Sequence, residues 1–448
     1  MSCPKVSMRV VARRYLGGAS LVLFFVFVLT NTLLAQTGSD GSGRMSDLSQ
    51  GSVRQAAVPA GGNMGGAPSQ VVPYISLSER YDSNVLFFPG NRLADYVTNI
   101  SAGARMNYRG DMAAGSLAGG LISEVYVNNP GLNYVGTNAS LNAVLDDAVG
   151  KVVRGLGLSI SDTMQYTPRL QAWLTPDVPQ SSFISGIQAY RNNSLTNNTN
   201  ILSTYSISPS DQVKASYSYE MMRFFGSQGG ASRTGALLFN TNVHGLVAGG
   251  DHYYNRTDSI GVSYLFQQMS FDPSVGGSSG MSAVVNGAMA TLRKSISREL
   301  TAEVSPGAAI LTSLPGKLQW TMAARLDWQS ALVNAQVSYT RGIFPGFFLA
   351  GGALISDVVT LSLSRNLTSQ WSIGSQTNYS TSRSLGAGSG SVGFESYGES
   401  LSASYTLYPG FIATATATWD RFTYGSVSSL DQVVNRHTAM ISFRADWE

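Results

Sequence analysis

Three histidines, His244, His252 and His437, are the only imidazoles in this 448-residue chain. Imidazole is the usual metal ligand and general base near neutral pH, but the spacing of these three residues forms no metal-ligand motif. Asp251 precedes His252 as one half of a catalytic dyad would, yet neighbours on an extended strand point to opposite faces. We therefore expect no metal site and no histidine-based catalysis.

Two further patterns have the composition of catalytic motifs. Gly276 to Gly280 reads Gly-Gly-Ser-Ser-Gly, which satisfies the pattern of a nucleophile elbow but lies in a Gly/Ser tract between two expected strands rather than between a strand and a helix. Asp146 and Asp147 are adjacent carboxylates, and we expect them to diverge on a strand. No phosphate-binding loop or dinucleotide fingerprint occurs. The sequence predicts a protein that is not an enzyme and needs no cofactor.

The remaining candidates are charged side chains on the polar faces of segments that alternate between polar and apolar residues. Charges of both signs with few large side chains between them suit a water-filled pore and would tune which solutes pass. The alternative is that these charges only pair with one another, because charge is rarely left unpaired inside a protein. The candidate pore-lining residues are Arg105, Glu124, Lys214, Glu220, Arg325, Asp327, Arg444 and Asp446.

The segments that would position these residues have the period-two pattern of half-buried strands. From Val213 to Glu220, Val, Ala, Tyr and Tyr alternate with Lys, Ser, Ser and Glu. From Phe411 to Asp420, Phe, Ala, Ala, Ala and Trp alternate with Ile, three Thr and Asp, and Leu318 to Trp328 follows the same rule. One face is suited to hydrocarbon and the other to water.

The connections between these segments alternate in length. We predict short polar turns near 109–111, 150–151, 209–210, 255–256, 297–298, 329–330, 366–367 and 409–410. Longer tracts rich in Gly, Ser, Pro or Asn fall near 87–95, 128–136, 166–197, 226–240, 272–280, 343–352, 383–391 and 425–434. Such alternation is typical of transmembrane barrels. The sequence predicts an all-β fold over residues 73–448, a closed antiparallel transmembrane β-barrel of about 16–18 strands.

Aromatic residues gather near the short turns and the C-terminus, where an interfacial girdle would need amphipathic rings. They are Tyr108, Trp328, Trp371, Tyr408 and Trp447. The alternative is that they are ordinary strand residues, since strands are rich in aromatics.

Composition supports a membrane barrel. Charged residues make up 12% of the chain, against about 25% in an average soluble domain. Mean hydropathy is only +0.03, and after residue 35 no apolar run approaches the roughly 18 residues needed to cross a membrane as a helix. Of the 29 basic residues four precede residue 35, which leaves 25 against 26 acidic residues, so no basic patch points to nucleic acid.

Residues 1–35 have the form of a signal peptide. Lys5, Arg9 and two further arginines precede an apolar run, and Ala35 offers a small residue for cleavage. An uncleaved inner-membrane anchor is the alternative, because Leu33 stands where a small residue is preferred. Cys3 is the only cysteine, so the mature chain would have no thiol. Residues 36–72 are rich in Gly, Ser and Ala without periodicity, which predicts a flexible periplasmic segment or a short plug inside the lumen.

The segment Arg80-Tyr81-Asp82-Ser83-Asn84, followed by Asp95-Tyr96-Val97-Thr98, resembles the opening of a family of β-barrel porins associated with bacterial exopolysaccharide and PEP-CTERM loci. The Ser-Pro turn at 206–211 is similar to turns of that family. At the C-terminus, Ile441 to Trp447 resembles the final-strand signal read by the barrel-assembly machinery, although Glu448 follows the aromatic residue. The resemblance implies a bacterial outer-membrane location and a role in polysaccharide export or surface assembly.

We consider three alternative functions and favour the first. The first is an outer-membrane channel, since 16 to 18 strands enclose an aqueous lumen. The second is a structural or glycan-binding barrel plugged by residues 37–70 or by an infolded loop. The third is an outer-membrane enzyme. The expected partners are outer-membrane lipid, the barrel-assembly machinery and components of polysaccharide export, with no nucleic acid.

Overall fold

The structure is a computed structural model that describes residues 70–86, 92–167, 193–225, 239–273, 281–312, 317–346, 352–385, 393–425 and 432–447. The predicted signal peptide and most of the predicted flexible segment lie outside these residues. No helix in the described part of the chain is long and apolar enough to cross a membrane.

The described chain is almost entirely β-structure. Strand alternation between apolar and polar residues favours extended backbone with two different faces. The strands are β1 (Gln70–Asp82), β2 (Asp95–Arg109), β3 (Ala114–Tyr126), β4 (Tyr134–Val144), β5 (Leu156–Thr167), β6 (Asn193–Ser206), β7 (Asp211–Phe225), β8 (Phe239–Tyr253), β9 (Ser259–Pro273), β10 (Met281–Ser295), β11 (Leu300–Leu311), β12 (Lys317–Gln329), β13 (Val333–Gly346), β14 (Gly352–Asn366), β15 (Trp371–Ser384), β16 (Gly393–Tyr408), β17 (Phe411–Gly425) and β18 (Gln432–Asp446).

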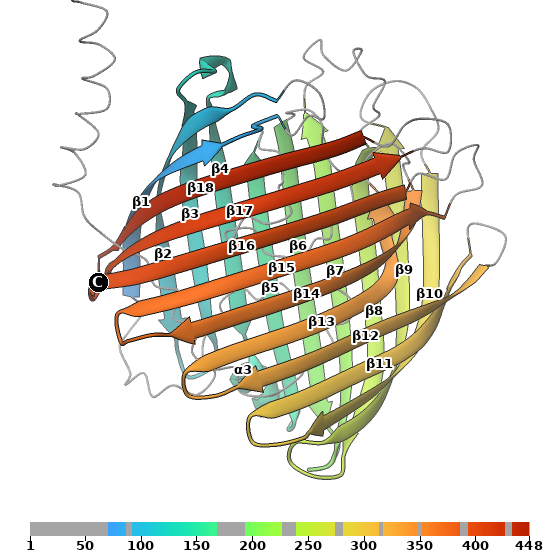
Figure 1. The fold of residues 1–448 in the computed structure, drawn as a ribbon. Helices are drawn as coiled ribbons and strands as arrows, with labels where there is room; N and C mark the ends of the chain where they lie inside the picture. The colour runs from blue at the N-terminus through green and yellow to red at the C-terminus, as the bar shows by residue number, and fades with distance from the viewer. Residues whose placement is uncertain are drawn as a thin grey trace, which may run out of the picture.

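These 18 strands form one sheet in which each strand pairs antiparallel with its sequence neighbours. The sheet closes because β1 also pairs with β18, with Leu77 opposite Phe443. Figure 1 shows the resulting barrel, with the end of the chain next to the start of β1. Closure removes the exposed edges that an open sheet would leave. The predicted closed antiparallel barrel is confirmed, and the strand number is the upper value of the predicted range.

The connections follow the predicted alternation with three differences. The long tract predicted at 343–352 is shorter, because β13 continues to Gly346 and β14 begins at Gly352. The turns that join β2 to β3, β6 to β7 and the later even strands to their successors are short and lie at the end of the barrel where β1 begins and β18 ends. The prediction of a short turn near 150–151 was wrong, because the helix α3 (Asp146–Val152) lies there. A connection at 312–316 was not predicted. In the β3–β4 connection the described residues include a 3-10 helix, η1 (Pro130–Leu132).

The turn between β16 and β17 shows how sequence sets these short connections. Proline fixes its own φ, and glycine alone adopts positive φ without strain. Pro409 and Gly410 form this turn, and Gly410 has a φ of 83°. The chain therefore reverses in two residues between long strands.

The two faces of each strand are distinct, as the alternation predicts. In β7 the side chains of Val213, Ala215 and Tyr217 are exposed, whereas those of Lys214 and Ser216 are buried. The same rule puts large apolar side chains on the outside of the wall around the barrel, among them Leu121, Leu246, Leu318 and Leu401. Polar and charged residues therefore face the enclosed interior.

Candidate functional site: the two faces of the barrel wall

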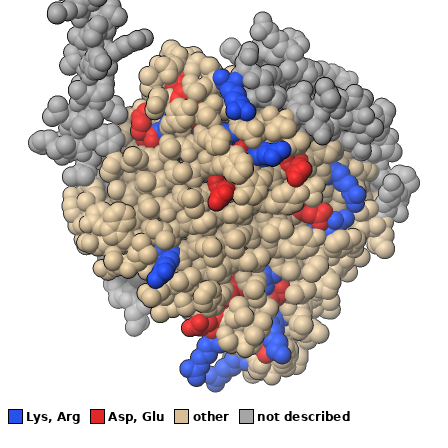
Figure 2. Space-filling view, in the orientation of Figure 1, with Lys and Arg blue, Asp and Glu red and all other residues tan. Residues whose placement is uncertain are grey.

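The outer face of the wall is an apolar surface. Exposed large apolar side chains recur on nearly every strand, for example Val262 on β9 at 66% exposure and Leu401 on β16 at 53%. Figure 2 shows a broad area of the visible wall without charged side chains, with the charged residues gathered mostly above and below it. Such a surface is poorly suited to water and well suited to hydrocarbon.

Aromatic rings border this apolar surface. The five aromatics predicted for a girdle, Tyr108, Trp328, Trp371, Tyr408 and Trp447, are all exposed near the short-turn end. Trp371 packs on Tyr405 with ring centroids 4.6 Å apart, and Tyr408 packs on Phe411 at the same distance.

A second group of rings lies nearer the long-connection end. Trp419 contacts Tyr397 at a centroid distance of 5.2 Å and stacks on the His437 ring, and Tyr81 contacts Tyr96 at 5.3 Å. Aromatic rings are enriched at both membrane interfaces because one side of each ring is apolar and the other polar.

The eight charged residues predicted from sequence all alternate with side chains of the outer face. Lys214 follows the exposed Val213, Glu124 precedes the exposed Val125, and Arg325 precedes the exposed Leu326. Since successive side chains point to opposite faces, these charged groups lie on the inner face of the wall. Their role as pore-lining residues stays a prediction.

Two ion pairs join predicted residues to each other. Arg325 and Asp327 lie two residues apart on β12, with an Nε to Oδ2 distance of 2.7 Å. Arg444 and Asp446 form the equivalent pair on β18, with an Nε to Oδ1 distance of 3.1 Å. The Arg444 guanidinium also lies 4.5 Å from the centroid of the Tyr74 ring. Stacking of this kind orients a cation that still carries its full charge.

The space for Tyr74 comes from two glycines on neighbouring strands. A Cβ at Gly103 or at Gly120 would lie 2.7 Å or 2.5 Å from the Tyr74 hydroxyl oxygen. A Cβ at Gly103 would also collide with the Gly119 backbone oxygen, and one at Gly120 would lie 2.9 Å from that of Ala102. A larger residue at either position would therefore disturb both the Tyr74 ring and the backbone of the neighbouring strand.

Two other predicted residues pair with partners that the sequence reasoning missed. Lys214 on β7 forms an ion pair with Asp251 on β8, and both side chains are buried. Glu124 on β3 accepts a hydrogen bond from Arg80 on β1 at 3.4 Å and another from the Tyr126 hydroxyl at 2.9 Å. The first pair joins neighbouring strands, and the Arg80–Glu124 pair joins strands two apart. Both pairs therefore depend on the register between strands.

Arg105 and Glu220 differ in their pairing from the other six predicted charged residues. Among the described residues, neither has an oppositely charged side chain within the 4.0 Å of an ion pair. The Arg105 Nε atom is buried and has no hydrogen-bond partner in that part of the chain. Glu220 lies opposite Val243, which belongs to a buried apolar cluster.

Among the described residues, a further charged cluster on the inner face contains residues that were not predicted. Asp82 on β1 accepts hydrogen bonds from Nε and Nη2 of Arg436 on β18, and Arg80 approaches the same carboxylate at 3.9 Å. Arg436 lies directly opposite Asp420 in the β17–β18 register. All four side chains are buried, and Arg80 continues the chain of contacts to Glu124.

A signal for this cluster was present in the sequence. Arg80 and Asp82 alternate with the aromatic Tyr81, just as Lys214 follows Val213. The resemblance to a porin family used these residues, but assigned them no role. Their partners on β17 and β18 are more than 300 residues away, and only the closure of the barrel brings them together.

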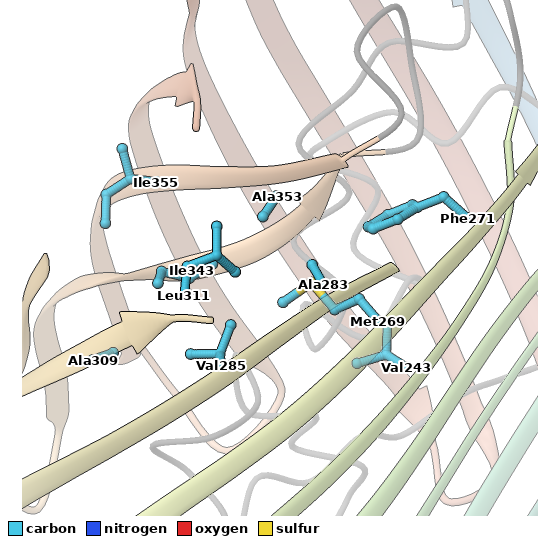
Figure 3. Close-up of a cluster of buried hydrophobic side chains, with 10 residues drawn as sticks. All are labelled: Val243, Met269, Phe271, Ala283, Val285, Ala309, Leu311, Ile343, Ala353 and Ile355. Carbon is cyan, nitrogen blue, oxygen red and sulfur yellow. The ribbon is translucent and has the colours of Figure 1, made fainter. Parts of the chain in front are cut away.

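The long-connection end of the interior is narrowed by the barrel's own wall. Ile343 on β13 and two residues of β14, Ala353 and Ile355, pack against inner-face side chains of β8 to β11 (Figure 3). Those inner-face partners are Val243, Met269, Phe271, Ala283, Val285, Ala309 and Leu311. To reach them, the ends of β13 and β14 must lie inside the barrel, across the inner faces of β11 and β12.

The candidate catalytic groups are dispersed. His244 contacts the Tyr217 hydroxyl at 2.9 Å, and His252 contacts Asp211 at 2.9 Å, while the neighbouring Asp251 is bound to Lys214. In the described residues no group of three or more His, Cys, Asp or Glu is arranged to hold a metal ion.

The structure gives no support for the two other catalytic patterns, the Asp146–Asp147 pair and the Gly276 to Gly280 tract. Asp146 does not lie on a strand as expected; it begins α3 and accepts a hydrogen bond from the Leu158 amide at 2.8 Å. The Gly276 to Gly280 pattern lies outside the described residues.

The sequence matches no protein-family model and no curated protein. Among solved structures, the chain is similar to the outer-membrane protein opdK from Pseudomonas aeruginosa, with 10% identity, a TM-score of 0.43 and coverage of 84% of this chain and 99% of that chain. It is also similar to Acinetobacter baumannii OccAB3, with 9% identity, a TM-score of 0.43 and coverage of 85% and 99%.

A third similar structure is Pseudomonas aeruginosa OccK2 (OpdF) in complex with glucuronate, with 10% identity, a TM-score of 0.41 and coverage of 85% and 98%. At these identities and TM-scores, the similarity identifies neither the family of this chain nor its substrate.

Proposed function

We propose that this protein is an outer-membrane channel that lets small polar solutes pass through the barrel without covalent catalysis. The observation that carries the proposal is the separation of the two faces of the wall. The outer face exposes apolar side chains bordered by aromatic rings, and the inner face carries ionised side chains held in pairs. A soluble β-protein would instead bury its apolar face.

The closed sheet supports the membrane part of the proposal. In a bilayer core every backbone amide and carbonyl must be paired within the protein, and only helices and closed barrels achieve this. The pairing of β1 with β18 satisfies the condition for the two terminal strands. Eighteen strands also give a barrel wide enough for an aqueous interior, whereas eight would be filled by side chains.

Fixed charges of the inner wall would select among solutes. Arg325 and Asp327 lie side by side, and Arg444 is oriented by both Asp446 and Tyr74. Paired charges contribute little net field but offer donors and acceptors to a passing polar solute. Arg105 has no pairing carboxylate in the described part of the chain, so it is the residue through which the net selectivity is best changed.

Conductance measurements test the proposal. The purified protein in a planar bilayer is expected to pass a steady ionic current, and Arg105→Glu is expected to shift the reversal potential in a salt gradient towards cation selectivity. Lys151→Glu is the matched control, because Lys151 lies in α3 outside the barrel wall and its reversal should leave selectivity unchanged. Absence of current from correctly folded protein would overturn the channel.

A plugged barrel is the second candidate, and one observation favours it. Phe271 and Met269 on the inner face have no exposed surface and belong to one buried cluster with Ile343 of β13 and Ala353 and Ile355 of β14. A plugged barrel would serve as a structural or glycan-binding protein and would pass no steady current. Deleting residues 37–70 asks whether that segment is the plug: a current that appears only after the deletion would identify it.

We also propose a narrower function that rests only on the sequence resemblance described above. In this version the solute is an exopolysaccharide, and the partners are export components, outer-membrane lipid and the barrel-assembly machinery, which would read β18. Neutral and anionic oligosaccharides added to one side of the bilayer should then block the current in a concentration-dependent way. Block by small carboxylates alone, with no effect of oligosaccharides, would contradict it.

A further inference from the structure

We propose that the ends of β13 and β14 form a gate that moves between the barrel interior and the barrel wall. The gate consists of residues 342–345 and 353–356. In the structure the gate lies inside the barrel. In the second position, β13 would pair with residues 317–321 of β12. The proposal rests on the channel function, since it describes how that channel would open and close.

The first observation is an early end to strand pairing. The β12–β13 register runs from Gln329 opposite Asn334 to Met322 opposite Arg341. β12 extends beyond this point to Lys317 and β13 to Gly346, and all these residues are described. β13 nevertheless keeps its full pairing with β14, from Val333 opposite Arg365 to Gly346 opposite Gly352. β14 also stays paired with β15 as far as Leu354 opposite Ser384, and Leu385 beyond β15 packs against the same buried cluster. The ends of β13 and β14 therefore separate from β12 and turn inward together with the end of β15.

The second observation is that the gate has the residue pattern of a wall segment. Continuing the β12–β13 register would put Trp320 opposite Ile343 and Leu318 opposite Pro345. Trp320 and Leu318 are outer-face residues, exposed at 53% and 66%. Ile343 and its partner Ile355 would then join the apolar outer face, which is the environment that continued alternation along β13 and β14 favours.

In the structure the same side chains are buried inside the barrel. Ile343, Ala353 and Ile355 belong to the same buried cluster as Val285 and Leu311, which lie on the inner faces of β10 and β11 (Figure 3). Gate residues thus have an apolar environment available in both positions. Two packings of one segment that differ little in free energy are the basis of a switch.

A cluster of side chains in mutual contact lies where β13 separates from β12. Arg341 stacks over the Trp320 ring at 4.1 Å and pairs with Asp357 of β14 at 2.7 Å, and the Tyr339 hydroxyl donates to the same carboxylate at 2.7 Å. Gly342 follows immediately. A Cβ there would meet only the Phe344 ring, at 3.3 Å, so the position is free of backbone obstruction. Glycine next to a fixed point gives the chain the freedom that a hinge needs.

The two gate positions predict opposite effects on the passage of solutes through the lumen. With the gate inside, β13 and β14 cover inner-face side chains of four strands and narrow the long-connection end of the lumen. With the gate in the wall, those side chains face water and the barrel has its regular width. The apolar partners Val285 and Leu311 would therefore stabilise the closed position only.

A disulfide across the extended register tests the movement. Gln319→Cys together with Phe344→Cys would be directly opposite with the gate in the wall, where Cα atoms of paired residues are about 4.5–5.5 Å apart, within the range that a disulfide accepts. The only native cysteine, Cys3, is replaced by Ser. Oxidation is expected to form the bond, seen by mass spectrometry, and to raise conductance at least about twofold, with reversal by reductant.

The matched control is Leu326→Cys with Val337→Cys, a pair that is already opposite in the wall below the gate. Its disulfide should form and leave conductance unchanged. If the Gln319/Phe344 bond never forms under oxidation while the control bond does, the movement is refuted. If it forms and the conductance of a conducting barrel stays the same, the gating is refuted and the channel function stands.

A second variant tests the closed position without a cross-link. Val285→Asn puts an amide under the gate where only the closed position buries it, so the open-to-closed ratio in single-channel records should rise roughly tenfold, or about 1.4 kcal/mol. Val247→Asn is the control, because Val247 is a buried inner-face valine outside the cluster. Equal effects of both variants would overturn the gate. If no variant conducts, locked or unlocked, the channel function fails, while disulfide formation still reports whether the gate moves.

Discussion

Asp82 lies between two guanidinium groups on the inner face of the wall. Arg436 holds both carboxylate oxygens and Arg80 lies 3.9 Å away, with almost no exposed surface on any of the three side chains. Removing one partner of a buried pair leaves an uncompensated charge, which costs more than the pair contributes. The cluster therefore stabilises the contact between the first and last strands.

Asp82→Asn is expected to lower the free energy of unfolding by about 3 kcal/mol, because Arg436 and Arg80 lose their shared carboxylate. Urea unfolding of the protein in lipid vesicles measures this. The control is Asp211→Asn, which breaks the half-exposed pair with His252 and should cost less than about 1 kcal/mol. Equal losses for the two variants would contradict the role of burial.

Asp258 joins two short turns. Its Oδ1 atom accepts a hydrogen bond from the Ser295 amide at 2.7 Å, and its Oδ2 atom accepts one from the Asn255 side chain at 2.8 Å. The Ser295 amide, followed by Asn255, lowers the pKa of the Asp258 carboxyl below its ordinary value. The ionised form thus stabilises the folded barrel.

A lowered pKa in the folded state gives stability that is present above the unfolded value, about 3.9, and is lost as the pH falls through the folded pKa. The stability difference between the protein and Asp258→Asn should therefore be constant above about pH 5 and shrink below about pH 4. Urea midpoints between pH 3 and 7 measure it. A pH-independent difference for Asp258→Asn would refute the linkage.

Single strands show the consequence of alternation most directly. On β13, Gln336 faces inwards and donates to Asp327 at 2.7 Å, whereas Val337 is exposed on the outer face. Neighbouring residues of one strand are therefore in environments as different as water and hydrocarbon. The strand is the scale at which sequence and environment match.

Val337→Arg is expected to destabilise the barrel by about 2–4 kcal/mol, because it puts a cation on the lipid face. Gln336→Arg, one residue away, should be tolerated, since the new guanidinium lies beside the Asp327 carboxylate. Unfolding in vesicles compares the two. A similar loss for both variants would show that Val337 does not face lipid.

Closure of the barrel is a property of the whole molecule. Ser78 on β1 lies opposite Ser442 on β18, and the pairing of these strands joins the two ends of an 18-stranded sheet. The buried charges of Asp82 and Arg436 meet only across this closure. The wall has no free edge at this point.

Ser78→Cys with Ser442→Cys, in a Cys3→Ser background, should form a disulfide in the assembled barrel and raise resistance to urea, because a bond that closes a loop of this length removes much chain entropy. Gel mobility with and without reductant shows the bond. Ser78→Cys with Thr438→Cys is the control, since Thr438 lies opposite Asp82, four residues further along the closure. Equal bond formation in both would argue against the register.

The sequence by itself determined the strands and their faces. A period of two residues distinguishes outer from inner side chains, so the eight inner-face charges from Arg105 to Asp446 could be placed without coordinates. Turn residues such as Pro409 and Gly410 marked where strands end. These are local properties, carried by residues next to one another in the chain.

Only the tertiary structure decided which residues meet. Asp82 and Arg436, or Lys214 and Asp251, are brought together by strand register, which no local pattern records. Ile343, which was predicted in a long connection, extends β13, yet Ile343 and Ile355 lie inside the barrel in one buried cluster with Val285 and Leu311. Alternation states which environment a side chain prefers, and it does not state which of two apolar environments the folded chain will use.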